Sequence, residues 1–150
     1  MFKLQSSERI RLWRKFRYDL DSMPLTKAIE ATNHFWQHCP FVPYNLEIAD
    51  PKSWPNPWEL ILENRYCDVA KVLAIVYTLY LTKHGEDLDP EIRAYLDTNS
   101  RYTYHIAYLC QGKYVLNLIE GEVVNKAHIT KNFKLKYCYT AGDLQLEQYK

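Results

Sequence analysis

The sequence lacks a strong excess of charge, a long uninterrupted apolar run and any Cys-x-x-Cys pair. Its net charge is only +1, so the attraction that drives nucleic-acid binding is missing and we expect no nucleic-acid partner. The longest apolar stretch lies within Val69–Leu81 and is interrupted by Lys71, so we expect no membrane span. Without paired cysteines at ligand spacing, neither a zinc ribbon nor a thioredoxin-type motif is indicated.

The N-terminal residues carry no apolar segment of the kind that a signal peptide requires. Met1–Leu4 runs directly into Gln5 and a charged stretch, so we expect no signal-peptide export. In a reducing compartment the four cysteines are expected to be free thiols. They are Cys39, Cys67, Cys110 and Cys138.

What the sequence does contain is a globular composition with many aromatic residues. Hydrophobic residues make up 47% and charged residues 25%, which suits a folded chain with a real core. No repeat or Gly/Ser-rich linker marks a boundary, so residues 1–150 are expected to form a single domain. The 13 Tyr and 4 Trp supply core volume and also favour contacts with protein partners.

The first half of the chain shows helical spacing. Apolar residues recur at helical intervals within Ser7–Asp21, and Thr26 is placed to cap a second helix that ends near Gln37. The proline-containing segment Phe41–Ser53 is expected to be an ordered loop.

The clearest local signal is Trp54-Pro55-Asn56-Pro57-Trp58-Glu59-Leu60. Asn56 suits the N-cap, Pro57 the first helical position, and Glu59 a capping box, so a short helix is predicted to start here. The main helix is predicted over Asn64–Lys83. It is apolar on nearly every side, which indicates that the fold encloses it, and its buried part begins at Cys67.

The second half shows the alternation of strands. We predict strands at Glu91–Asp97, Tyr102–Cys110, Tyr114–Ile119, Val123-Val124 and Phe133–Tyr139. The first of these also has a possible helix start at Asp89-Pro90. Helices followed by an antiparallel sheet predict an α+β fold, with a central buried helix packed on the sheet.

A cysteine at the start of a buried helix suggests nucleophilic chemistry. The free N–H groups and the helix dipole stabilise a thiolate, which then needs a His partner and an Asn or Asp that orients it. Cys67, His105 and Asn117 occur in that order on the predicted helix, strand and adjacent strand. The alternative interpretation is purely structural: Cys67 is a small core residue, and His105 is a core side chain whose hydrogen bonds are satisfied within the fold.

The register of the predicted hairpin decides whether Asn117 reaches His105. A three-residue turn, Gln111–Lys113, sets His105 opposite Ile119 and leaves Asn117 a diagonal neighbour on the same face. A two-residue turn pairs His105 with Leu118 and turns Asn117 to the other face, unless a bulge intervenes. Glu120 is then the nearest polar substitute.

Other clusters give weaker signals. His34 and His38 lie one helical turn apart beside Cys39, but no further ligand is evident and they are typical of a helix surface. An acidic segment lacks the alternating ligands of a calcium loop and is typical of a solvated turn. Its members are Glu86, Asp87, Asp89 and Glu91. We therefore expect no metal and no cofactor.

Three segments together resemble the core of transglutaminase-like proteins, which share the papain-like cysteine peptidase arrangement. The segments are Asn64–Ala70, Tyr104–Tyr108 and Tyr114–Asn117. Trp54–Leu60 is similar to a segment of small transglutaminase-like proteins of tailed bacteriophages. Two features differ: Asn117 stands where transglutaminases more often have Asp, and no Gly-rich or Trp-containing signature surrounds Cys67.

The resemblance implies acyl transfer at an amide or isopeptide bond. Cys67 would attack the carbonyl, His105 would protonate the leaving amine, and the oxyanion hole would use the Cys67 N–H with a second donor, Trp54 or Trp58. The alternative is a catalytically silent structural or assembly protein of a phage particle, which uses the same fold for protein contacts. The expected location is accordingly the cytoplasm or a virion.

Overall fold

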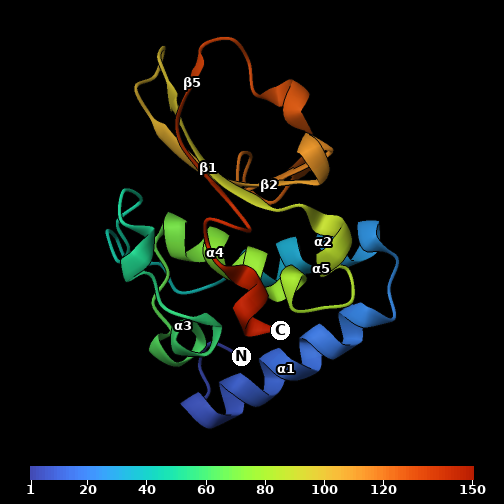
Figure 1. Cartoon of the computed structure of the whole chain (residues 1–150). Helices are drawn as coiled ribbons and strands as arrows, with labels where there is room; N and C mark the ends of the chain where they lie inside the picture. Colours follow the sequence, from blue (N-terminus) through green and yellow to red (C-terminus); the bar gives the residue numbers. More distant parts are fainter.

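The computed structural model describes residues 1–150 as a helical layer beneath an antiparallel sheet. In Figure 1 the strands form the upper part, α4 crosses the middle, and α1 runs along the bottom. The N- and C-termini lie close together in the lower half of this view, between α1 and α4. None of the helices has both the length and the apolar character needed to cross a membrane. The predicted α+β class is confirmed.

Five α-helices make up the helical layer. They are α1 (Ser6–Asp21), α2 (Leu25–Trp36), α3 (Pro57–Glu63), α4 (Asp68–Tyr80) and the short α5 (Gly85–Leu88). The capping box predicted for α3 is present: the Asn56 side chain accepts from the Glu59 N–H at 2.8 Å, and Glu59 reaches back to the Asn56 N–H. The predicted cap at Thr26 is wrong, because Pro24 precedes α2 and the Thr26 hydroxyl bonds to Tyr114 instead.

The helix α4 forms the centre of the core. All its residues from Val69 to Tyr80 are buried except Lys71, as its apolar sequence predicts. Thr78 on α4 accepts hydrogen bonds from the indoles of Trp13 and Trp36, each at 3.0 Å, which ties α1 and α2 to this helix. The helix is shorter than predicted, because Asn64 has a left-handed backbone (φ 54°) and caps the end of α3 rather than the start of α4.

Five strands form one sheet in the order β4-β3-β2-β1-β5. They are β1 (Glu91–Asp97), β2 (Thr103–Leu109), β3 (Tyr114–Leu116), β4 (Val123–Val124) and β5 (Phe133–Thr140). One face packs on α4 through Ile92, Ala107 and Leu109. The other face carries a separate small cluster that includes Tyr95, Ile106 and Tyr108.

The hairpin between β2 and β3 differs from the prediction. Leu109 pairs with Tyr114, so four residues, Cys110–Lys113, connect the strands instead of three. The strand β3 ends at Leu116, and Asn117 follows it with a left-handed backbone (φ 69°). Asn117 therefore lies just outside the sheet ladder, where strand alternation no longer fixes the direction of its side chain.

Candidate functional site

Cys67 occupies the N-cap of α4, one residue before the helix begins. Its backbone is extended (φ −81°, ψ 180°), and its side chain is buried with 5% of its surface exposed. Its main-chain N–H makes no backbone hydrogen bond. The main-chain N–H of Leu46 lies 3.3 Å from the Cys67 sulfur and donates to it. The Cys67 thiol in turn lies 4.0 Å from the Leu46 carbonyl oxygen, to which it can donate.

The loop that carries Leu46 is fastened to its surroundings. Asn45 donates to the Arg65 carbonyl at 2.9 Å, just before Cys67 in the chain. The Trp54 indole donates to the Glu47 carbonyl at 2.8 Å, and the Tyr139 hydroxyl on β5 donates to the Ile48 carbonyl at 2.8 Å. These bonds hold the backbone on both sides of Leu46, so its N–H is positioned before any substrate arrives.

His105 lies on β2, on the face that packs against α4, because it alternates in step with Ala107 and Leu109. It lines the same cleft as Cys67, which has a volume of about 560 Å³. The remaining lining comes from the loop, the start of α4 and the start of β2. These residues are Phe41, Pro43, Tyr44, Leu46, Glu47, Ile48, Asp68, Val69, Tyr102 and Thr103. The structure therefore brings together two of the three predicted site residues in one open cleft.

The environment of His105 favours its neutral form. Burial lowers the pKa of the imidazole below its usual 6.5, and the nearby carboxylates of Asp68 and Glu47 oppose that effect. Its Nδ1 atom is buried and has no hydrogen-bond partner. A neutral imidazole beside a thiol can accept a proton, which is the role a catalytic base needs.

Asn117 contacts His105 through the main chain rather than through the ring. Its side-chain amide donates to the His105 carbonyl at 2.9 Å. Asn117 has a left-handed backbone where it makes this contact, and neither Asn117 nor Glu120 bonds to the imidazole. Asn117 thus fixes the strand that carries His105, while the orientation of the ring rests on its burial.

The expected second oxyanion donor is not a tryptophan. The Trp54 indole is already bonded to the Glu47 carbonyl, and Trp58 packs edge-on against Tyr149, away from the cleft. The donor near the sulfur is the Leu46 N–H. A main-chain amide has no signature in the sequence, so residue types alone gave no means of finding it.

The other candidate clusters do not assemble into a site. The rings of His34 and His38 are 6.0 Å apart and edge-on, and no group of three or more His, Cys, Asp or Glu side chains stands close enough to hold a metal. A second cleft, of about 580 Å³, lies beside β5 and the C-terminal turn Leu146–Tyr149. It includes Cys138 but no histidine, so it lacks the pairing that Cys67 has.

All four cysteines are free, but three of them have raised pKa values. Burial raises the pKa of Cys39 to about 11, and burial together with a hydrogen bond to Glu91 raises that of Cys138 to about 11. Burial also raises the pKa of Cys110. These three thiols are therefore protonated near neutral pH.

Comparison with known proteins supports the same fold. Solved structures of Legionella pneumophila LapG superpose on this chain with a TM-score of 0.69 and 16% identity, over 91% of this chain and 76% of LapG. The calcium-bound form of LapG gives 0.72 and 15% identity, over 93% of this chain and 78% of LapG. LapG has a transglutaminase-like cysteine protease fold. This chain has the transglutaminase-like fold.

The remaining comparisons add no further relationship. No family model matches the chain, and no curated protein matches it. The EGTA-treated form of LapG gives a TM-score of 0.70 with 16% identity, over 91% of this chain and 74% of LapG. All three structures are of LapG, so the resemblance to phage proteins gains no support, and a location in the cytoplasm or a virion stays a prediction.

Proposed function

We propose that this chain is a cysteine-nucleophile enzyme that cleaves or transfers the acyl group of an amide or isopeptide bond. The observation that carries the proposal is the shared cleft: Cys67, at the start of the buried helix α4, opens onto the same space as His105. The Leu46 N–H donated to the Cys67 sulfur adds a group that favours the thiolate. The likeness of the fold to LapG over most of the chain supports this assignment.

The first half of the reaction uses Cys67 and His105. His105 takes the thiol proton, and the Cys67 sulfur forms a bond to the substrate carbonyl carbon. The carbonyl oxygen becomes an oxyanion, which the main-chain N–H groups of Cys67 and Leu46 stabilise. The imidazolium of His105 then gives its proton to the amine nitrogen as the carbon–nitrogen bond breaks, and an acyl thioester remains on Cys67.

The second half releases the acyl group. His105, neutral again, removes a proton from a water molecule or from a second amine, which attacks the thioester carbon. The carbon–sulfur bond breaks, and the sulfur regains the proton from His105. Water yields a carboxylic acid, whereas an amine yields a new amide. Asn117 acts in this scheme as a positioning residue, because it holds the His105 main chain rather than any reacting atom.

The test is alkylation of the native protein by iodoacetamide near neutral pH, followed by mass mapping of each cysteine. We expect Cys67 to react at least about 10-fold faster than Cys39, Cys110 and Cys138, because thiolate fraction governs the rate. His105→Gln should slow Cys67 and leave the other three unchanged. Equal rates at all four cysteines contradict the proposal.

A second candidate function is a catalytically silent protein of the same fold that serves in an assembly, such as a phage particle. The aromatic residues at the mouth of the cleft favour it, because Tyr44 is 98% exposed and Phe41 is 67% exposed. Rings so exposed are typical of surfaces that meet another protein. The alkylation experiment separates the two functions, since a silent protein has no reason to keep Cys67 more reactive than its other cysteines.

A further inference from the structure

We propose that the cleft at Cys67 selects a polypeptide segment with a lysine or arginine side chain close to the bond that is attacked. This inference rests on the proposed function, whose substrate class it names. It follows from the charges of the cleft, from the aromatic rings at its mouth and from its size.

The charged side chains of the cleft are all acidic. Glu47 and Asp68 line it, and no lysine or arginine does. Neither carboxylate forms an ion pair, because the three salt bridges of the chain lie elsewhere. A basic side chain in this cleft would meet two uncompensated carboxylates, whereas an acidic side chain would be repelled by both.

The two carboxylates are not equivalent. Asp68 is the first residue of α4, where a negative charge also stabilises the helix through its dipole. Glu47 lies on the loop, and its only side-chain hydrogen bond is a long one of 3.4 Å to the Ala49 N–H. Glu47 forms no ion pair and caps no helix, and its charge also opposes the lowering of the His105 pKa. It is therefore the residue with which to test selection of a basic substrate, by binding rather than by rate.

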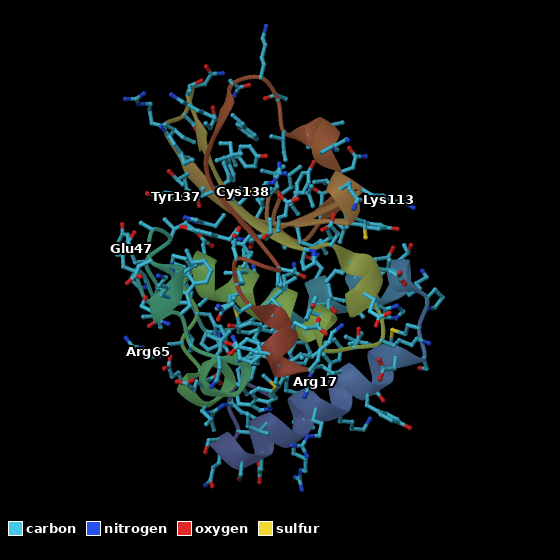
Figure 2. All side chains as sticks on the ribbon, in the orientation of Figure 1. Arg17, Glu47, Arg65, Lys113, Tyr137 and Cys138 are labelled. Atoms are coloured by element: carbon cyan, nitrogen blue, oxygen red, sulfur yellow. The ribbon has the colours of Figure 1, made fainter.

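The position of Glu47 suits contact with a substrate that enters from solvent. Figure 2 shows it at the edge of the molecule, beside the level at which the helical layer meets the sheet. The nearest labelled cation on this side, Arg65, lies lower in the view, next to α3, and does not line the cleft. The negative charge of Glu47 therefore faces the cleft without a cationic side chain among the lining residues.

Exposed aromatic rings at the mouth provide the second element of recognition. Tyr44 and Phe41 stand on the loop, and Tyr102, which is 53% exposed, stands opposite at the start of β2. The aliphatic stem of lysine or arginine packs on such rings, and the cationic head is attracted to their faces. Glu47 and these rings line the same cleft, so we expect one basic side chain to use both.

The size of the cleft favours a stretch of polypeptide over a small free amine. Its volume of about 560 Å³ is that of a site for a ligand the size of a short peptide. A diamine would leave most of this space and the three rings without contacts. The side chain that we expect is thus part of the acyl-donating chain, on one side of the bond that Cys67 attacks.

The experiment measures binding without chemistry, on the full chain carrying Cys67→Ala. Peptides that contain one arginine or lysine are compared, by fluorescence anisotropy at low salt, with the same peptides carrying citrulline or norleucine there. We expect the basic peptides to bind about fivefold more tightly, since a partly exposed charge contact has that worth. Glu47→Gln should remove the preference, and Glu122→Gln, which changes an exposed acid outside the cleft, should retain it.

Three results overturn the inference. Equal binding of the basic and neutral peptides would show that the cleft does not select a positive charge. A preference for basic peptides that survives Glu47→Gln would show that they bind at another surface. Competition by free cadaverine as strong as that by the peptide removes the polypeptide requirement. Because alkylation of Cys67 is measured separately on the unmodified chain, a failed binding test leaves the proposed nucleophile standing, and a failed alkylation test leaves the binding preference measurable.

Discussion

Cys67 and Cys138 lie on opposite sides of the same sheet, and each has a titratable partner nearby. Cys67, on the helical side, faces a cleft with His105 and receives the Leu46 N–H at 3.3 Å. Cys138 lies on β5, opposite Arg93 in the register, and its thiol donates to the Glu91 carboxylate at 2.9 Å. Figure 2 shows Cys138 in the upper part of the molecule, on the sheet.

The two sites differ in the hydrogen bonds at sulfur. Cys67 receives the Leu46 N–H at 3.3 Å, and its nearest acceptor is the neutral Leu46 carbonyl at 4.0 Å, whereas Cys138 donates to a carboxylate at 2.9 Å. A donor that points at sulfur stabilises the thiolate, whereas an acceptor at the same distance stabilises the thiol. Glu91 is such an acceptor, and together with burial it raises the pKa of Cys138 to about 11. The candidate nucleophile is therefore identified by its neighbours, because the residue type is the same in both places.

The largest expected effect is on catalysis. Cys67→Ala should reduce amide hydrolysis on the order of 10³-fold or more, because it removes the atom that forms the thioester. Cys138→Ala should leave the rate within about twofold, since Cys138 is protonated and distant from His105. The rate is measured on the best substrate from a peptide library. If Cys67→Ala keeps turnover close to that of the unmodified chain, Cys67 is not the nucleophile, and the contrast drawn with Cys138 is wrong.

The second-largest expected effect is an increase in the reactivity of the Cys138 thiol. Glu91→Gln removes the carboxylate that accepts from the thiol and leaves the Arg93 cation beside the sulfur. We expect the iodoacetamide rate of Cys138 near neutral pH to rise about 10-fold, which corresponds to a fall of about one unit in its pKa. Glu122→Gln is the matched control. An unchanged rate at Cys138 would mean that burial, and not Glu91, keeps this thiol protonated.

Much of the fold follows from local sequence. The capping box at Asn56 and Glu59 was predictable because it is closed within four residues, and the buried helix α4 because its apolar residues face every direction. The end of β3 was not predictable. The sequence continues with Leu118 and Ile119, and the left-handed turn at Asn117 depends on its tertiary contact with the His105 carbonyl.

The sequence could predict the parts of the candidate site that are side chains, but not the part that is a main-chain N–H. Cys67 and His105 stand out as residue types on a helix start and a strand, and the structure places both in one cleft. The role expected of Asn117 toward the imidazole was not met, because the hairpin loop has four residues and the amide bonds to the main chain. Leu46 acts through its backbone N–H, so its contribution could be recognised only once the path of the loop in the structure was known.

The third effect concerns pH. Burial lowers the pKa of His105 below 6.5, so the neutral base persists to more acidic pH than for an ordinary histidine. The acid limb of kcat/KM should therefore fall below pH 6.5, with activity lost as pH decreases through that lowered value. Glu47→Gln removes a carboxylate that raises this pKa, and should move the limb further toward acid. An acid limb above pH 6.5 would assign it to a group other than His105.

The smallest effect tests how the loop holds the Leu46 N–H. Tyr139→Phe removes one hydroxyl, the donor to the Ile48 carbonyl at 2.8 Å, and keeps the ring. We expect alkylation of Cys67 to slow about threefold, because a loop that is less firmly held aligns its N–H less well, and the free energy of unfolding to fall by about 1 kcal/mol. The rate at Cys138 should not change, since its sulfur bonds to Glu91 on the other face.

Tyr137→Phe is the control for this prediction, because Tyr137 lies on the same strand, 6.2 Å from the Tyr139 ring and nearly parallel to it, and donates no hydrogen bond from its hydroxyl. It should leave both cysteines as they are. If Tyr139→Phe lowers stability while Cys67 keeps its rate, the hydroxyl supports the fold and the remaining bonds position the loop. If both tyrosine variants slow Cys67 equally, the stacked rings and not the Ile48 contact shape the cleft. If Tyr139→Phe slows Cys67 and Tyr137→Phe does not, the reactivity of the buried sulfur depends on the hydrogen bond between the Tyr139 hydroxyl on β5 and the Ile48 carbonyl of the loop.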